Sequence, residues 1–453
     1  MKTESLARWC GGVWSVLPTF PLTRVTQDSR AACLGALYVA LKGPNHDGHD
    51  FVPAAFRAGA TAALVRADWT PPPEIAHLPL LRVDDPAAAL LAIAKGYRAD
   101  LRPFVCGITG SAGKTTLKEL AAAMLSGAGP TAATPGNYNN EVGLPLSVLA
   151  VPEDARFAVI EAGISHPGDM DPLADILRPN AAAIASIGPA HIEFFGSVEA
   201  IAAEKAKLLA AVRPKGFAVL PLGVPGEVIL RAACRCRVVT AALGNPAADY
   251  VGEPLAKGVV RVHRGDEPAV LLETGLCGEH NASNALIAYA LAREAGATAG
   301  QALAGLAAFK APPMRWEAVQ AGPVHAINDA YNANPLSMRA ALETFAGMDA
   351  PAGKVVCVGD MLELGDASDA QHRAVGEASG NGPWRLLAGV GPASRALLEG
   401  AVKAGYPATQ TVWFASTAEA AEALPLLLRP GETLLIKGSR GMRLETLLDA
   451  LRR

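Results

Sequence analysis

The chain has 453 residues, and at about 150 residues per domain this length allows three domains. Hydrophobic residues make up 51% and charged residues 18%, which excludes wholesale disorder, and no apolar run is long enough to span a membrane. The net charge of −3, from 40 basic and 43 acidic residues, excludes a polycationic surface for nucleic acid. The seven cysteines are scattered, and residues 1–30 lack the apolar block of a signal peptide, so we expect a cytoplasmic protein.

Short aliphatic runs alternate with alanine- and leucine-rich helical stretches, a pattern typical of βαβ units around parallel sheets. Strands are predicted at 104–110, 157–163, 181–188, 217–223, 324–330, 354–360 and 433–439. Helical stretches break at 100–103 and at 310–313, where prolines stand. We therefore predict an α/β protein with domains at 1–101, 102–313 and 314–453, the first of which has few long aliphatic strands.

The clearest motif is GITGSAGKTT, at 107–116, between a predicted strand and a predicted helix. Its glycines let backbone N–H groups converge on phosphate oxygens, Lys114 supplies a positive charge, and Thr115 offers a hydroxyl to Mg²⁺. Because Ile108 stands where the longer phosphate-loop motif has its first glycine, the match is to the shorter G-x-x-G-K-T. The residues predicted to bind the phosphates of ATP are Gly110, Ser111, Ala112, Gly113, Lys114, Thr115 and Thr116.

Three further residues have an ordinary interpretation beside a functional one. Glu161 stands at the carboxyl end of a predicted strand, where a carboxylate suits Mg²⁺; the alternative interpretation is a solvated glutamate at a strand end. His191 also follows a strand and is either a metal ligand or a surface histidine. Lys205 lies in a helical run with Ser197 as its N-cap, and by default such a lysine is exposed.

An asparagine-rich loop precedes the predicted helix in the segment GNYNNEVGLPLSVL, at 136–149. The amides of Asn139 and Asn140 and the carboxylate of Glu141 can read the hydrogen-bonding groups of a polar ligand. Asparagine-rich turns also arise from turn chemistry alone, so both interpretations stay open.

Taken in order, several blocks resemble the central domain of the Mur ligases: GITGSAGKTT, GNYNNEVGLPLSVL, EAGISHPGDM, AHIEFFGS, EKAKLL and HNASNALIA. The blocks DAYNANP, GDMLELG and KGSRGMR resemble the branch of that family that adds D-alanyl-D-alanine. TQDSR and GALYVALKGPNHDGHDF resemble its uridine-nucleotide domain. The resemblance implies an N-terminal UDP-sugar-binding domain, a central phosphate-loop ATPase domain and a C-terminal Rossmann-like domain that binds the incoming dipeptide.

The resemblance also implies roles for individual residues. Lys114, Lys205 and His191 would be catalytic, with Lys205 carbamylated by CO₂, and Mg²⁺ would be held by Thr115, Glu161 and His191. ATP would further contact Asn281, Arg315, Asp329, Tyr331 and Asn332. The substrates would contact Ser29, Arg30, Asn139, Asn140, Glu141, His166, Asp360, Glu363, Lys437, Ser439 and Arg440. Met314 stands where the family usually has glycine before the arginine.

The dipeptide site has a physical rationale of its own. Lys437, Ser439 and Arg440 follow a strand and precede a helix predicted to start near Met442. The segment can therefore offer a cation, a hydroxyl and a helix N-terminus to a carboxylate. Asp360 and Glu363 would line the other side. An ordinary basic loop is the alternative interpretation of this segment.

The implied reaction is ATP-dependent amide bond formation between UDP-N-acetylmuramoyl tripeptide and D-alanyl-D-alanine, in peptidoglycan precursor synthesis, by a monomer without membrane or nucleic-acid partners. A second hypothesis is the sister ligase that adds the third amino acid, but its DNPR block does not occur in this sequence. A third is a nucleotide-binding regulatory module that keeps the fold without ligation. Phosphate release with and without both acceptors separates this last class from the enzymes.

Overall fold

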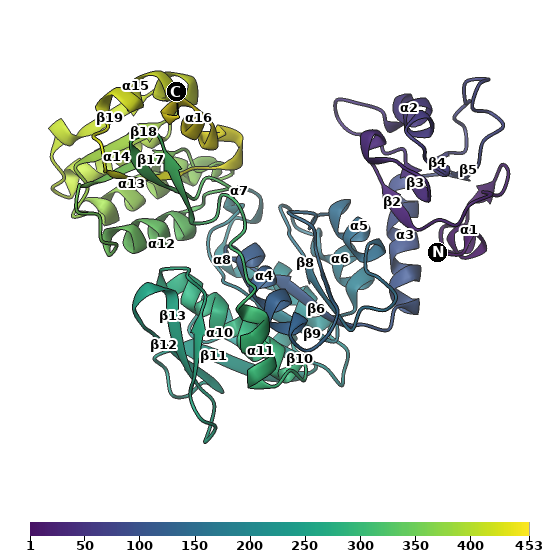
Figure 1. Cartoon of the computed structure of the whole chain (residues 1–453), viewed down its shortest axis with the longest axis horizontal. Coiled ribbons are helices and arrows are strands. Elements are labelled where there is room, and N and C mark those ends of the chain that lie inside the picture. The colour runs from purple at the N-terminus through teal and green to yellow at the C-terminus, as the bar shows by residue number, and fades with distance from the viewer. Residues whose placement is uncertain (453) are drawn as a thin grey trace. The chain divides into compact units, whose positions relative to one another are not determined.

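A computed structural model describes residues 1–452 (Figure 1). These residues form two compact units. The first unit comprises Met1–Gly107, Gly129–Ile164 and Gly168–Asn180, and the second comprises Ile108–Ala128, Ser165–Pro167 and Ala181 onward. The strands of the described chain belong to three sheets, one for each domain of the predicted α/β architecture. All seven strands predicted from the sequence are confirmed, as is the helix capped by Ser197, whose hydroxyl accepts from the N–H of Ala200 at 3.1 Å.

The N-terminal sheet has the strand order β1-β5-β4-β3-β2, and its neighbours run parallel except for the β1–β5 pair. Its strands are β1 (Val13–Trp14), β2 (Arg24–Thr26), β3 (Ala36–Val39), β4 (Ala62–Arg66) and β5 (Leu80–Val83), and its helices are α1 (Thr3–Cys10), α2 (Val52–Arg57) and α3 (Pro86–Asp100). These strands are short, which explains why few long aliphatic strands could be predicted in this domain. Strand β3 is buried at all four positions, as expected of a parallel strand covered on both faces.

The central domain contributes strands and helices to both units. In the first unit, β7 (Thr131–Ala133) pairs in parallel with β8 (Phe157–Glu161); this unit also holds α5 (Gly143–Leu149) and α6 (Met170–Leu177). In the second unit, parallel pairs join β9 (Ala181–Ile184), β10 (Phe217–Pro221), β11 (Arg237–Leu243) and β12 (Tyr250–Pro254). Antiparallel pairs then add β13 (Val259–His263) and β14 (Val270–Glu273).

The phosphate-loop region connects β6 (Phe104–Thr109) to α4 (Lys114–Ser126). The remaining central helices are α7 (Ile192–Phe195), α8 (Val198–Ala210), α9 (Glu227–Ala233), α10 (Glu279–Glu294) and α11 (Ala299–Leu306). Helix α10 is buried along most of its length, which explains its run of small and aliphatic residues.

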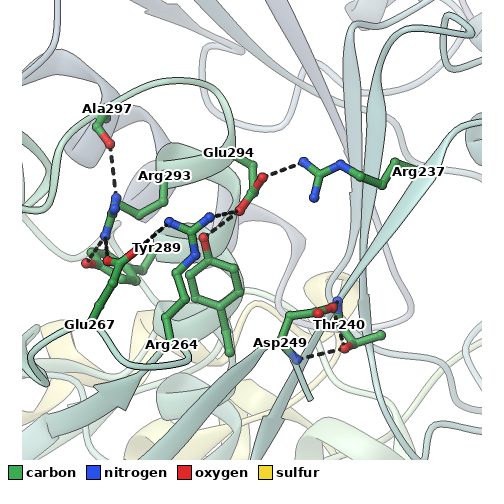
Figure 2. A network of polar contacts seen from close by, with 10 residues as sticks. Arg237, Thr240, Asp249, Arg264, Glu267, Tyr289, Arg293, Glu294 and Ala297 are labelled. Atoms are coloured by element: carbon green, nitrogen blue, oxygen red, sulfur yellow. Dashed lines mark hydrogen bonds and ion pairs between the residues drawn. The ribbon is translucent and has the colours of Figure 1, made fainter. Parts of the chain in front are cut away.

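A polar network fixes the carboxyl end of α10 to the neighbouring strands (Figure 2). The largely buried carboxylate of Glu294 forms an ion pair with Arg237 of β11. It also accepts hydrogen bonds from the hydroxyl of Tyr250 at 2.8 Å and from the guanidinium of Arg264 at 2.7 Å. Arg264 in turn contacts Glu267 at 2.8 Å. Glu294 is the buried charge of this network, and its two arginine partners and the Tyr250 hydroxyl compensate it where α10 meets the sheet.

The C-terminal sheet, green to yellow in Figure 1, has the strand order β15-β16-β20-β17-β18-β19, in which only β15 runs antiparallel. Its strands are β15 (Glu317–Ala321), β16 (Val324–Asn328), β17 (Lys354–Gly359), β18 (Leu386–Val390), β19 (Thr411–Phe414) and β20 (Thr433–Lys437). Helices α12 (Pro335–Ala346), α13 (Ser368–Ser379) and α14 (Ser394–Lys403) pack on one face, and α15 (Thr417–Leu427) and α16 (Leu447–Leu451) on the other. This layering is the predicted Rossmann-like arrangement.

The predicted start of the last helix is wrong. The sequence predicts a helix from about Met442, but two short 3₁₀ turns, Arg440–Met442 and Leu444–Thr446, come first, and α16 begins at Leu447. Arg443 between them has φ +53°, a left-handed conformation that cannot continue a right-handed helix. The segment after β20 therefore offers no α-helix N-terminus to a ligand.

No helix within residues 1–452 is long and apolar enough to cross a membrane.

Candidate active site

The phosphate loop lies between β6 and α4 and is fixed from behind by the segment that follows β9. The N–H of Ser111 donates to the carbonyl of Ser186 at 2.8 Å, and the N–H of Ala112 donates to the Ser186 hydroxyl at 2.9 Å. Gly113 has φ +79°, and a Cβ there would lie 2.8 Å from the amide of Asn284, so only glycine fits. The ammonium of Lys114 donates to the carbonyl of Gly110 at 3.0 Å, which places it over the loop as the motif predicts.

A side chain of the C-terminal domain reaches this loop. The Arg315 guanidinium donates to the Thr115 hydroxyl at 2.9 Å and stacks on the Tyr331 ring at 4.1 Å. The amide of Asn334 donates to the carbonyl of Ser111 at 3.3 Å. Predicted ATP-binding residues from two domains are thus brought together around Thr115.

The conformation of Met314 explains the family's usual glycine. Met314 has φ +56°, a left-handed conformation that costs a side chain about 1–2 kcal/mol and costs glycine nothing. Trp316 adopts the same conformation, at φ +57°. The chain therefore retains the loop geometry that turns Arg315 toward Thr115 in spite of the substitution.

Lys205 is not the exposed helix lysine of the ordinary interpretation. Its side chain in α8 is only 1% exposed. Burial lowers the pKa of Lys205 well below its usual value, and the nearby Lys114 ammonium lowers it further, while Glu204 opposes the shift. Burial and the Lys114 charge thus both act against the ammonium form of Lys205.

His191 lies against Glu363 of the C-terminal domain. The Nδ1 of His191 is 2.5 Å from Oε2 of Glu363. Nearby in sequence, in α7, Phe194 contacts the ring of His166, with 4.3 Å between the two ring centroids. The contact with His191 holds the pKa of Glu363 below its usual value, and His166 lowers it further, although burial opposes the shift. This Nδ1 is buried and the nearest carboxylate oxygen is that of Glu363, although the angle of approach is not that of a well-formed hydrogen bond.

In the first unit, Glu161 ends β8 and is only 1% exposed, which is incompatible with a solvated glutamate. Its carboxylate accepts from the Asn139 amide at 2.6 Å. Asn140 instead accepts from the N–H of Gly143 at 2.9 Å within the turn that leads into α5, while Glu141 is exposed. Of the asparagine-rich loop, Asn139 therefore faces the strand end, and Asn140 has the turn role that the sequence left open.

The segments DAYNANP, GDMLELG and KGSRGMR contact one another at the carboxyl ends of β16, β17 and β20. The ammonium of Lys437 donates to Asp329 at 2.7 Å and to the carbonyl of Asn332 at 3.1 Å. The Ser439 hydroxyl accepts from the N–H of Leu362 at 2.9 Å. Lys437 thus neutralises Asp329, and its charge is already engaged within the protein.

Asp360 and Arg440 differ in their surroundings. The Asp360 carboxylate is buried and accepts from the N–H of Ser394 at 2.8 Å, and burial raises its pKa. Arg440 is about half exposed and contacts Glu445 at 2.8 Å. Of the predicted dipeptide residues around this loop, Arg440 presents the more accessible cation.

Three further predicted residues have contacts within their own parts of the chain. Asn281, buried in α10, donates to the carbonyl of Cys277 at 2.8 Å. Arg30 is exposed and pairs with Asp28 at 2.8 Å, which lowers the pKa of Asp28 to about 2, and Ser29 begins the 3₁₀ turn beside it.

Sequence reasoning missed two contributors to the site. Ser186 and Asn334 both bond to the phosphate loop: Ser186 lies two residues after β9, and Asn334 directly precedes α12. His280, the second residue of α10, lies against Trp316, and burial lowers its pKa to about 4. A polar residue at the carboxyl end of a parallel strand was the available signal.

Comparison with known proteins places these features in one family. Residues 21–98, 108–292 and 314–440 match the families described as "Mur ligase family, catalytic domain", "Mur ligase middle domain" and "Mur ligase, glutamate ligase domain". The chain is 34% identical to the UDP-N-acetylmuramoyl-tripeptide–D-alanyl-D-alanine ligase of Bacillus subtilis, over 94% of this chain and 92% of the relative. It is 35% identical to that of Escherichia coli, over 95% and 94%.

Solved structures agree with the sequence comparison. The fold is similar to the structure titled MurF from Acinetobacter baumannii, with a TM-score of 0.88, 30% identity, and coverage of 100% of this chain and 99% of that one. It is also similar to MurF ligase from Thermotoga maritima in complex with ADP, with a TM-score of 0.80, 25% identity, and coverage of 95% and 97%. From its phosphate loop, its third-domain arginine and these full-length matches, we conclude that the chain belongs to the Mur ligase family, in the branch of the UDP-N-acetylmuramoyl-tripeptide–D-alanyl-D-alanine ligases.

Proposed function

We propose that this chain is an ATP-dependent ligase that joins D-alanyl-D-alanine to UDP-N-acetylmuramoyl tripeptide through an acyl phosphate, in peptidoglycan precursor synthesis. The observation that carries the proposal is the contact between Arg315 and Thr115, which unites an ATP-binding loop with the third domain in a chain whose full-length relatives bear this name. ATP phosphorylates the terminal carboxylate of the tripeptide, the dipeptide amine attacks the acyl phosphate, and phosphate leaves from the tetrahedral intermediate.

The charges of the site fit the first step. A carboxylate and the γ-phosphate repel each other, so cations must neutralise them before their oxygens approach. Lys114 and Arg315 lie at the phosphate loop and supply two such charges. Closure of the third domain over ATP aligns the reactants and excludes water from the acyl phosphate.

The residues present also suit Mg²⁺. Among residues 1–452, no group of three or more histidines, cysteines or carboxylates is arranged as a closed metal cage. Mg²⁺ is usually bound through one or two protein groups together with waters and phosphates, so such a cage is not required. We propose the Thr115 hydroxyl, the buried Glu161 carboxylate and His191 as its protein ligands. Thr115 lies in the first turn of α4, Glu161 ends β8, and His191 directly precedes α7. When bound, Mg²⁺ neutralises phosphate charge and polarises the γ-phosphoryl group.

Carbamylation of Lys205 belongs to the same proposal. CO₂ reacts with a neutral amine, and burial favours that form of Lys205. The product is an anion that resembles a carboxylate and can organise metal and phosphate. An exposed lysine such as Lys215 is surrounded by water and lacks the buried environment that favours the neutral amine.

For the dipeptide carboxylate we propose Arg440, with Ser439, as the principal contacts. Replacing Arg440 by alanine should raise the KM of the dipeptide by about tenfold, because a charge-assisted hydrogen bond at a half-exposed position is lost. The KM values of ATP and of the nucleotide sugar should change little. Steady-state kinetics with each substrate varied in turn measure this, with Arg443→Ala on the same loop as the control. Equal increases for all three substrates would contradict the assignment.

The most direct test of the proposed function separates a ligase from a regulatory module of the same fold. Phosphate release is measured with ATP alone, with either acceptor and with both. We expect release only when nucleotide sugar and dipeptide are both present, and an amide product in equal amount. ATP binding without release under any of these conditions would favour the regulatory module. We further propose that the enzyme acts as a monomer in the cytoplasm, in keeping with its seven free thiols.

A further inference from the structure

Two strained residues meet where α7 approaches the loop after β17. His191 has φ +58° and Glu363 has φ +61°, both left-handed conformations that a residue with a Cβ rarely adopts. Their side chains lie 2.5 Å apart, and the N–H of Glu193 donates to the carbonyl of Glu363 at 3.4 Å. Strain on both sides of one contact indicates that the surrounding structure holds the two side chains together.

The loop that carries Glu363 is anchored from behind. The N–H of Met361 donates to Nε2 of His372 at 2.9 Å, and Nδ1 of His372 contacts the carbonyl of Ser368 at 2.8 Å, in a fully buried site. The next N–H, that of Leu362, donates to the Ser439 hydroxyl at 2.9 Å. Glu363 follows these two anchors directly, so its position depends on the same loops that are proposed to receive the dipeptide.

The distance between the two groups decides how they can act on a cation. Two ligand atoms at adjacent corners of a Mg²⁺ octahedron lie about 3 Å apart, given metal–ligand distances of about 2.1 Å. Nδ1 and Oε2 are closer than that, at 2.5 Å, so in this arrangement they are partners of each other rather than joint ligands. His191 can then offer only Nε2 to a metal.

We propose that Glu363 is a positioning residue that acts through His191. Its carboxylate fixes the tautomer and the orientation of the imidazole, so that Nε2 is free to bind the divalent cation that accompanies ATP. A carboxylate behind a metal-binding histidine commonly has this role, and its loss weakens metal binding about 10- to 100-fold. The inference rests on the proposed function, in which His191 is a metal ligand.

This assignment differs from the sequence prediction that Glu363 contacts the dipeptide. It also links two events: the cation is bound well only while the GDMLELG loop is seated against α7. Seating of the C-terminal domain would thereby complete the cation site as well as the dipeptide site.

The test measures cation binding apart from turnover. Mn²⁺ affinity of the full-length enzyme with ADP is measured by electron paramagnetic resonance for the wild type, Glu363→Gln, His191→Asn and the double variant. We expect each single substitution to weaken Mn²⁺ binding about tenfold and the double variant to be no weaker than His191→Asn. Asp366→Asn removes an exposed carboxylate from the same loop and should leave the affinity unchanged.

The outcomes separate the two levels of the proposal. If His191→Asn leaves Mn²⁺ affinity unchanged, His191 is not a ligand and that part of the proposed function is wrong. If His191→Asn weakens binding but Glu363→Gln does not, the positioning role is overturned. A rise in the dipeptide KM of Glu363→Gln with unchanged Mn²⁺ affinity would restore the dipeptide contact in its place.

Discussion

Replacing Lys114 by alanine is expected to abolish ligation while leaving the fold intact. The ammonium lies over the phosphate loop, bonded to the carbonyl of Gly110, and its charge is needed most when the γ-phosphate approaches a carboxylate. Loss of this contact should cost on the order of 3 kcal/mol or more in the transition state, about a hundredfold in rate. Single-turnover ADP formation and a thermal melt measure the two parts of this expectation.

The control for this variant is Lys215→Ala, which removes an exposed lysine from the same domain and should change neither rate nor melting temperature. Near-normal turnover of Lys114→Ala with normal ATP affinity would contradict the phosphate-loop assignment. A large drop in melting temperature would instead indicate a structural role for the lysine.

Replacing Lys205 by alanine is expected to inactivate the enzyme, and a small carboxylate such as acetate should restore part of the activity. The reason is that the proposed carbamate is an anion at a buried position, which alanine cannot supply and acetate can imitate. Enzyme equilibrated with ¹³C-labelled bicarbonate should also show a carbamate carbon resonance that Lys205→Ala lacks.

Lys207, two residues further along α8, provides the comparison. It is partly exposed and paired with Glu204 at 2.8 Å, so Lys207→Ala should retain the carbamate signal and most of the activity. A plain ammonium on Lys205 in enzyme equilibrated with nucleotide and CO₂ would overturn the proposal, as would full activity of Lys205→Ala without carboxylate.

Much of the fold was predictable because its signals are local. Buried parallel strands such as β8 and β17 are continuous aliphatic runs, and the phosphate-loop region combines a strand, a glycine turn and a helix within residues 104–126. The N-terminal sheet was harder to predict because its strands have two to five residues, too few to show a period. The late start of α16 depends on the backbone of Arg443, which no propensity indicates.

The partners within the candidate site were less predictable, because they depend on which strand ends lie side by side. Lys437 and Asp329 are 108 residues apart in sequence and meet because β20 and β16 are neighbours. The pair of His191 and Glu363 depends on the packing of α7 against the C-terminal loop. Residue types thus indicated the chemistry of the site, whereas tertiary structure decided which charges remain available to substrates.

The acceptor that supports ADP formation tests the central claim most directly. UDP-N-acetylmuramoyl dipeptide and tripeptide are each offered with free lysine, diaminopimelate or D-alanyl-D-alanine, and ADP is followed over time. The proposed function predicts turnover with the tripeptide nucleotide and D-alanyl-D-alanine, and none with a free amino acid. Turnover only with the dipeptide nucleotide and a free amino acid would contradict it and assign the chain to the sister ligase.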